Sequence, residues 1–332
     1  MNDIILDVFM LGGGGLLLYF GAEWLVAGAA GLARSVGVSG LVIGLTVVAY
    51  GTSTPEVIVG MQAAFAGHSD IALANVLGSN IANLGLILGL AAMLRPARID
   101  ATLFRRELPL LVASALVVPL LLLDGQIQQW EGIALLTVAA LYTAWMVYSS
   151  RRAIGNAVIA AVVADLADTA DSANSAGAPS PQHGRARLAG IAIVGLAVLI
   201  VGGQLLVGGA VGAAHKLGMS ERIVGLTIVA VGTSLPELVT SIIATRRGHT
   251  DIAVGNVIGS NIFNVLLCLG GASMVGRVGA PIQTVALDVG AMIAFTLVAT
   301  VMMRSGRIVT RIEGLILVLG YAAFLTLLVA LG

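Results

Sequence analysis

The sequence contains little charge and a single cysteine. Charged residues make up 10% of the 332-residue chain, whereas soluble domains carry about 25%. The 17 basic residues balance the 17 acidic ones, so the sequence indicates no nucleic-acid partner. Cys268 has no second cysteine with which to form an internal disulfide. The opening MNDIILDVFM has no Lys or Arg, unlike a secretory signal peptide.

Motifs of common enzymes and nucleotide sites are also missing. The sequence has no GxSxG and no HExxH, and its glycine-rich runs at 12–15 and 201–212 lack the following GK[ST] of a phosphate-binding loop. We expect these glycines to allow helices to pack closely instead. The sequence therefore predicts a protein that is not an enzyme and holds no cofactor.

Long apolar runs dominate what is present. The chain is 58% hydrophobic, with a mean hydropathy of +1.02. Most runs approach the roughly 20 residues that cross a bilayer as a helix. We interpret ten of them as spans: 8–30, 40–66, 71–94, 107–123, 130–150, 188–213, 222–245, 252–275, 284–303 and 312–331. The sequence therefore predicts an all-α polytopic membrane protein with ten transmembrane helices.

The basic residues predict how these spans are oriented, because cytoplasmic loops carry the excess of Lys and Arg. With both termini outside, only Lys216, Arg222 and Arg277 of the 17 basic residues remain outside the cell. The opposite orientation inverts this ratio. The segment 153–187, rich in Ala, Ser and Asp, then becomes a flexible cytoplasmic linker. We expect the protein in an inner or plasma membrane.

The two halves of the chain repeat one another. A shift of 181 residues places GLTVVAYGTSTPE (44–56) on GLTIVAVGTSLPE (225–237), and GHSDIALANVLGSN on GHTDIAVGNVIGSN. More than half of the positions in 44–89 are identical, polar residues included. Each half, 1–152 and 188–332, holds five expected spans, so the second half must enter the membrane from the opposite side. Inverted repeats are typical of secondary transporters, whose ion site lies between the repeats at the midplane.

Each GTSxPE motif places a proline and a carboxylate inside an apolar run. Pro55 lacks an N–H and crowds the carbonyl of Gly51, so we expect the helix to open around Ala49 to Thr52 and release carbonyl oxygens. Glu56 follows one turn later, with Thr52 and Ser53 on the same face. The second copy repeats the arrangement with Gly232, Thr233, Ser234, Pro236 and Glu237.

The span after each motif adds polar residues spaced by four. These are Asn75, Ser79 and Asn83 in the first half, and Asn256, Ser260 and Asn264 in the second. Carboxylate, hydroxyl, amide and carbonyl oxygens together favour hard cations such as Ca²⁺ or Na⁺. Two carboxylates are neutralised by one Ca²⁺, by two or more Na⁺, or by two protons. Glu23 in the first span corresponds to Gln204, an asymmetry that argues against a core ligand and leaves Glu23 as a pathway or interhelix residue.

At GTSTPE…GSNIAN and GTSLPE…GSNIFN the sequence resembles the cation/calcium exchanger superfamily, specifically the sodium/calcium exchanger branch with its prokaryotic members. The resemblance implies a four-helix core flanked by two long sliding helices, spans one and six. It implies calcium binding by Glu56 and Glu237 with the carbonyls of Thr52 and Thr233. For sodium it implies the same pair with the Ala49 and Ala230 carbonyls, Thr52, Thr233, Ser53, Ser234, Ser79 and Ser260. Asn83 and Asn264 would line the middle position.

The sequence departs from this family at one place. Some prokaryotic members carry Asp where this chain has Asn264, so a third carboxylate that could take a proton is missing here. We predict a monomeric secondary antiporter in the lipid bilayer that exchanges Ca²⁺ for Na⁺. The alternative within transport is a proton-coupled Ca²⁺ or Na⁺ antiporter. A cation channel and an intramembrane enzyme are the alternatives from other classes.

Overall fold

The computed structural model describes residues 2–99, 101–168, 182–216 and 230–331, which are nearly all helical. The first half contains α1 (Asn2–Val36), α2 (Gly40–Ile43), the π-helical η1 (Gly44–Val48), α3 (Ala49–Thr52), α4 (Thr54–Phe65), α5 (Ser69–Ala82), the π-helical η2 (Asn83–Ile87), α6 (Leu88–Leu94), β1 (Ala97–Arg98), α7 (Ala101–Leu121) and α8 (Gln129–Asp168).

The second half repeats this order of elements. It contains α9 (Gln182–Lys216), α11 (Ala230–Thr233), α12 (Leu235–Arg246), α13 (Thr250–Phe263), the π-helical η4 (Asn264–Leu269), α14 (Gly270–Val275), α15 (Ile282–Gly306), β2 (Ile308–Val309) and α16 (Arg311–Leu331). The strands β1 and β2 pair antiparallel over two residues each and join the two halves at one edge of the helical fold.

Eight helical segments in the described residues are long and apolar enough to cross a membrane. They correspond to eight of the ten expected spans. The fourth expected span is helical as α7, but Arg105, Arg106 and Glu107 lie close together near its start. The seventh, 222–245, is described only from residue 230 onward. The polytopic helical membrane fold is confirmed, while the count of ten stays a prediction.

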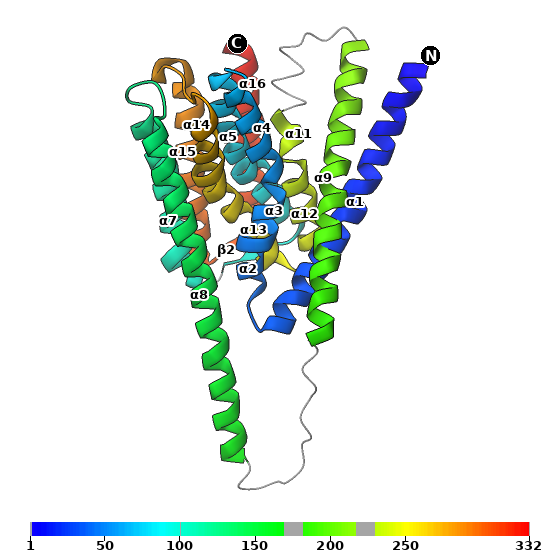
Figure 1. Ribbon diagram of the computed structural model, residues 1–332, viewed down its shortest axis with the longest axis vertical. Coiled ribbons are helices and arrows are strands. Elements are labelled where there is room, and N and C mark those ends of the chain that lie inside the picture. Colours follow the sequence, from blue (N-terminus) through cyan, green and yellow to red (C-terminus); the bar gives the residue numbers. More distant parts are fainter. Residues whose placement is uncertain (1, 100, 169–181, 217–229, 332) are drawn as a thin grey trace.

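The two halves run in opposite directions (Figure 1). The chain starts at the upper end of α1 and reaches the lower end of α8; the second half starts at the lower end of α9 and finishes at the upper end of α16. The start of α1 and the finish of α16 therefore lie at the same end of the molecule. Which end faces the cytoplasm stays a prediction.

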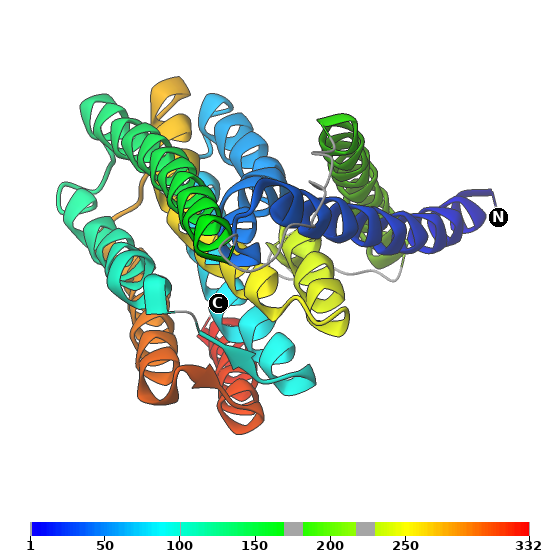
Figure 2. The same cartoon turned by 90° about the horizontal axis from the view of Figure 1, so that it is seen from below.

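The helices that carry the repeated motifs lie between two flanking layers. Figures 1 and 2 place α1 and α9 together on one flank and α7 and α8 on the other. The segments 69–94 and 250–275, which contain α5 and α13, are central because they are the most deeply buried. The apolar stretches of these two spans are 78% and 94% buried, against 28% for the span formed by α9. A helix enclosed on all sides can hold polar groups away from lipid, which is where an ion site must lie.

The segment 153–187 is only partly the loop that we expected. Helix α8 continues to Asp168 and α9 already begins at Gln182, so both ends of this segment are helical. The reason is local composition, because AIGNAVIAAVVADLAD is rich in alanine and contains no proline. Its role as a linker between the halves stays a prediction.

Glycines allow α1 and α9 to touch backbone to backbone. Gly14 and Gly21 on α1 meet Gly202 and Gly195 on α9, and a Cβ added at Gly21 would lie 2.5 Å from the backbone N of Leu199. Small residues of this kind let membrane helices approach closely. The expectation for the glycine-rich runs is confirmed here, although Gly12 and Gly13 of the first run face open space.

Candidate cation site

Each GTSxPE motif interrupts its helix, but one residue later than we expected. Residues Ala49–Thr52 remain helical, and the break falls at Ser53, whose φ is −82° and ψ is 1°. The N–H of Ser53 still donates to the Ala49 carbonyl at 3.0 Å, so the turn before the break is closed. Proline has no N–H to donate, and its ring disfavours helical geometry in the residues just before it. The break therefore falls at the α3–α4 junction.

The second motif breaks in the same way at Ser234, with φ −88° and ψ 7° between α11 and α12. In each half the proline sits in the first turn of the following helix, where its missing N–H removes no hydrogen bond. Glu56 and Glu237 consequently lie in the first turns of α4 and α12, at the positive ends of these helices. A buried carboxylate is stabilised at that position.

The carboxylates of the two halves are held by serines of the opposite half. Ser53 donates to Oε1 of Glu237 at 3.0 Å, and Ser234 donates to Oε1 of Glu56 at 3.2 Å. Ser260 adds a longer bond to Glu237 at 3.5 Å. Both Glu side chains are completely buried. The two motifs, 181 residues apart in the sequence, therefore form one site.

Several oxygens at this site have no hydrogen-bond partner among the described residues. They include the Oε2 atoms of both carboxylates, the Ser79 hydroxyl and the amide oxygen of Asn83, whose amide nitrogen is unpaired as well. Leaving a buried polar atom unpaired costs about 1–3 kcal/mol, and more for a charged one. A cation held by these oxygens would remove that cost, and its charge would oppose the repulsion between two buried carboxylates.

Asn256 connects the two halves behind the carboxylates. Its Oδ1 accepts from the Thr52 hydroxyl at 3.1 Å, while its Nδ2 donates to Ser241 at 3.0 Å and to the Glu237 carbonyl at 3.4 Å. Because the Thr52 hydroxyl donates its proton in this bond, its oxygen keeps both lone pairs, which a cation could use. Asn75, the repeat counterpart, donates to the Glu56 carbonyl at 3.1 Å and has no second partner within the described ranges.

We expect Asn256→Leu to lower the apparent cation affinity about tenfold, roughly 1.4 kcal/mol, because the Thr52 hydroxyl loses its acceptor. Cation titration of the purified protein measures this. Thr52→Val should have a similar effect, and the double variant should be no worse than the stronger single variant, since both remove one interaction. Asn75→Leu is the matched control with a smaller effect. Additive losses would show that Asn256 does not act through Thr52.

The two middle asparagines differ in their surroundings. Asn264 donates to Asn80 at 3.2 Å and accepts from the Cys268 thiol at 3.5 Å. The amide of Asn83 has no such partner in the described part of the chain. The bond from Asn264 lets Asn80 connect α5 with η4. The halves are therefore unequal at the site, although their sequences are alike.

The structure brings most of the predicted ligands together. Ser53, Ser234 and Ser260 are hydrogen-bonded to the carboxylates, and Thr52 to Asn256 behind them. Ser79, Asn83 and Asn264 are buried in the adjoining segments α5, η2 and η4. Thr233 lies half-buried in α11. Ala230 is the first residue of α11, and its side chain falls outside the described part. That these residues bind a cation stays a prediction.

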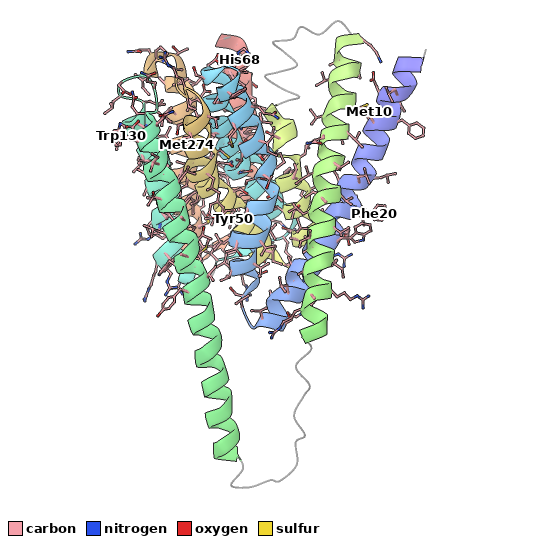
Figure 3. The ribbon with its side chains drawn as sticks, in the orientation of Figure 1. Met10, Phe20, Tyr50, His68, Trp130 and Met274 are labelled. Carbon is pink, nitrogen blue, oxygen red and sulfur yellow. The ribbon has the colours of Figure 1, made fainter. Side chains whose placement is uncertain are left out.

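Sequence reasoning missed the π-helical segments and the aromatic support of the site. Segments η2 and η4 begin at Asn83 and Asn264, and π-helical turns often occur at functional sites. The ring of Tyr50 packs on Phe263 with centroids 4.0 Å apart, near the centre of the molecule (Figure 3). No residue pattern in the sequence marks a π-helical turn, whereas Tyr50 could have been noticed from its position next to Gly51.

The buried carboxylate of Glu107 was also missed. Glu107 on α7 accepts a hydrogen bond from Tyr142 on α8, and the Tyr142 ring also packs on Phe263. The signal was available in the sequence, because the 181-residue shift places Glu107 on Asp288. Glu107 is therefore part of the packing between α7 and α8, with its own partner.

Two inverted helical halves that enclose a buried, all-oxygen site with two carboxylates define a membrane cation transporter. The sequence model of the family described as sodium/calcium exchanger protein matches residues 6–148 and 187–330. The chain belongs to the sodium/calcium exchanger family, a family of transporters and not of enzymes.

Individual relatives agree with this assignment. The chain is 37% identical to CaxA of Alkalimonas amylolytica over 98% of this chain and 99% of that protein. It is 30% identical to the sodium/calcium exchanger MaX1 of Methanosarcina acetivorans, covering 94% and 95% of the two chains. A solved structure of the sodium-calcium exchanger NCX_Mj superposes with a TM-score of 0.81 and 29% identity, over 96% of this chain and 98% of that one.

Proposed function

We propose that this protein is a secondary antiporter that exchanges Ca²⁺ for Na⁺ by alternating access. The observation that carries the proposal is the reciprocal pairing of Ser53 with Glu237 and Ser234 with Glu56, because it joins two buried carboxylates from opposite repeats. Membership of the sodium/calcium exchanger family and the likeness to NCX_Mj support the choice of ions.

The proposed ligands are oxygens on both sides of the two motif breaks. Glu56 and Glu237 bind either ion, and their two negative charges are balanced by one Ca²⁺ or by two or more Na⁺. The neutral ligands complete the sphere: Thr52, Thr233, Ser53, Ser234, Ser79, Ser260, Asn83, Asn264 and the carbonyls of Ala49 and Ala230. The Ala49 carbonyl already accepts from Ser53, so it would use its second lone pair.

Competition for one carboxylate pair couples the two ion fluxes. An empty pair of buried carboxylates is unfavourable, so the protein would reorient only when Ca²⁺ or Na⁺ neutralises it. In the proposed cycle, the paired helices α1 and α9 slide across the motif helices and expose the site to one side at a time. The protein would work as a monomer in an inner or plasma membrane, with both termini outside.

The test is ⁴⁵Ca²⁺ uptake into proteoliposomes loaded with Na⁺ and diluted into Na⁺-free buffer, at fixed pH and clamped voltage. We expect uptake that disappears when choline replaces internal Na⁺. Uptake that ignores Na⁺ but follows an imposed pH gradient would contradict the proposal and support the proton-coupled alternative. Unitary currents in the same membranes would instead indicate a channel.

A further inference from the structure

An ion pair joins the flanking helix α1 of the first half to the end of the motif helix α12 of the second half. Glu23 on α1 pairs with Arg247, the residue after the end of α12. The Glu23 side chain is only 15% exposed, and it lies within a membrane-spanning helix. Such a carboxylate is costly without a partner. Arg246 and Arg95 also lie at this turn, so Glu23 supplies negative charge to a basic region.

Apolar packing accompanies this ion pair. Leu25 and Ala29 of α1 share one buried cluster with Ile243 and Ala244 of α12. The corresponding contact in the other half, between α9 and α4, is marginal in the described residues. Helix α1 therefore packs on the second motif helix α12, whereas α9 meets the first motif at Gly51 and makes only marginal contact with α4. This is the asymmetry that an inverted-repeat transporter shows when it faces one side.

The ion pair has no counterpart in the opposite arrangement. The 181-residue shift places Glu23 on Gln204 and Arg247 on Ala66. When the two repeats exchange conformations, the contact of α1 with α12 is replaced by the contact of α9 with α4. Gln204 would then face Ala66, and no charges would pair. Most residues of the apolar contact have apolar counterparts, because Leu25, Ala29 and Ala244 align with Leu206, Ala210 and Ala63. An apolar contact can therefore form in either arrangement, whereas the charge contact cannot.

We propose that Glu23 and Arg247 form a latch that stabilises the access state seen here and is absent from the opposite state. The proposal rests on alternating access as part of the proposed function. The latch sets the ratio of the two states without touching the ion site. A second ion pair, Asp7 with Lys216, joins α1 to α9 and moves with them, so it cannot distinguish the states.

The experiment measures the two states directly. Spin labels are placed on the exposed positions Leu16 of α1 and Phe65 of α4, and buried Cys268 stays in place. We expect one dominant distance in the unchanged chain. Glu23→Gln and Arg247→Gln should each raise the minor population about fivefold, and the exchanged pair Glu23→Lys with Arg247→Glu should restore the original ratio. Asp7→Asn is the control that leaves the ratio unchanged.

Two outcomes would overturn the latch: a ratio that does not change in either single variant, or a change that the exchanged pair fails to reverse. Arg247 is half exposed, so its variant is expected to fold even where Glu23→Gln does not. The measurement needs no transported ion, so it stands apart from the flux test of Na⁺/Ca²⁺ exchange. If the spin-label ratio changes as expected but Na⁺ does not drive Ca²⁺ uptake, the latch is supported and only the proposed pair of exchanged ions is rejected.

Discussion

Replacing Glu56 or Glu237 by glutamine should abolish Na⁺-dependent Ca²⁺ uptake. Each change keeps the side-chain shape and an oxygen that can accept from Ser234 or Ser53, but removes one of two charges that face a divalent ion. Removing one member of a buried charged interaction costs about 3–5 kcal/mol, so we expect a loss of at least about 100-fold. The measurement is ⁴⁵Ca²⁺ uptake at several external Ca²⁺ concentrations.

The matched control for these variants is Glu107→Gln. Glu107 is also buried in a long helix, α7, but its partner is Tyr142 and not the carboxylate pair. A glutamine there can still accept from Tyr142, so uptake should persist. Size-exclusion profiles and helical content must match for all three variants. Normal exchange by either Glu56→Gln or Glu237→Gln would reject these residues as the charged ligands.

Enlarging Gly21 should strongly destabilise the protein, because α1 and α9 leave no space for a side chain there. A Cβ at Gly21 would lie 2.7 Å from the Leu199 Cα and 2.8 Å from the Gly195 carbonyl oxygen. These are backbone atoms, so the helices themselves must separate. Overpacking of this kind costs about 1–3 kcal/mol. We expect a large drop in the melting temperature for Gly21→Leu and a smaller drop for Gly21→Ala.

The control for this prediction lies on the same helix. Gly13 has nothing within 4 Å of an added Cβ, and alanine is favoured over glycine in a helix by about 1 kcal/mol. Gly13→Ala should therefore keep or slightly raise the melting temperature, followed by tryptophan fluorescence in detergent. If Gly21→Leu melts like the unchanged chain, the α1–α9 contact is looser than the structure indicates.

The close contact of α1 and α9 also has a mechanistic consequence. Gly195 meets α1 as closely as Gly21 meets α9, since its added Cβ would lie 2.4 Å from the Leu25 backbone N. At both ends polar contacts connect the pair, between Asp7 and Lys216 and between Arg185 and the Ser35 carbonyl. Two helices joined in this way along their length are expected to move as one unit, as the proposed cycle requires.

Features with a local or periodic physical cause could be predicted from the sequence. Hydropathy predicts membrane helices, because each must satisfy its backbone hydrogen bonds within itself. Proline in GTSxPE predicts a break, since it lacks an N–H. The repeat, which aligns Glu56 with Glu237, predicts two inverted halves with one shared site. These properties belong to single segments or to the comparison of two segments, and no packing needs to be known.

The tertiary structure alone decided which atoms meet. The sequence does not state that Ser53 reaches Glu237 and not Glu56, that Asn264 is held by Asn80 while Asn83 is not, or that Glu23 finds Arg247. The sequence also predicts a break between Ala49 and Thr52. In the structure the N–H of Ser53 still bonds to the Ala49 carbonyl, so the break falls at Ser53 instead. Such contacts depend on how helices from opposite halves pack, and packing breaks the symmetry that two similar sequences share.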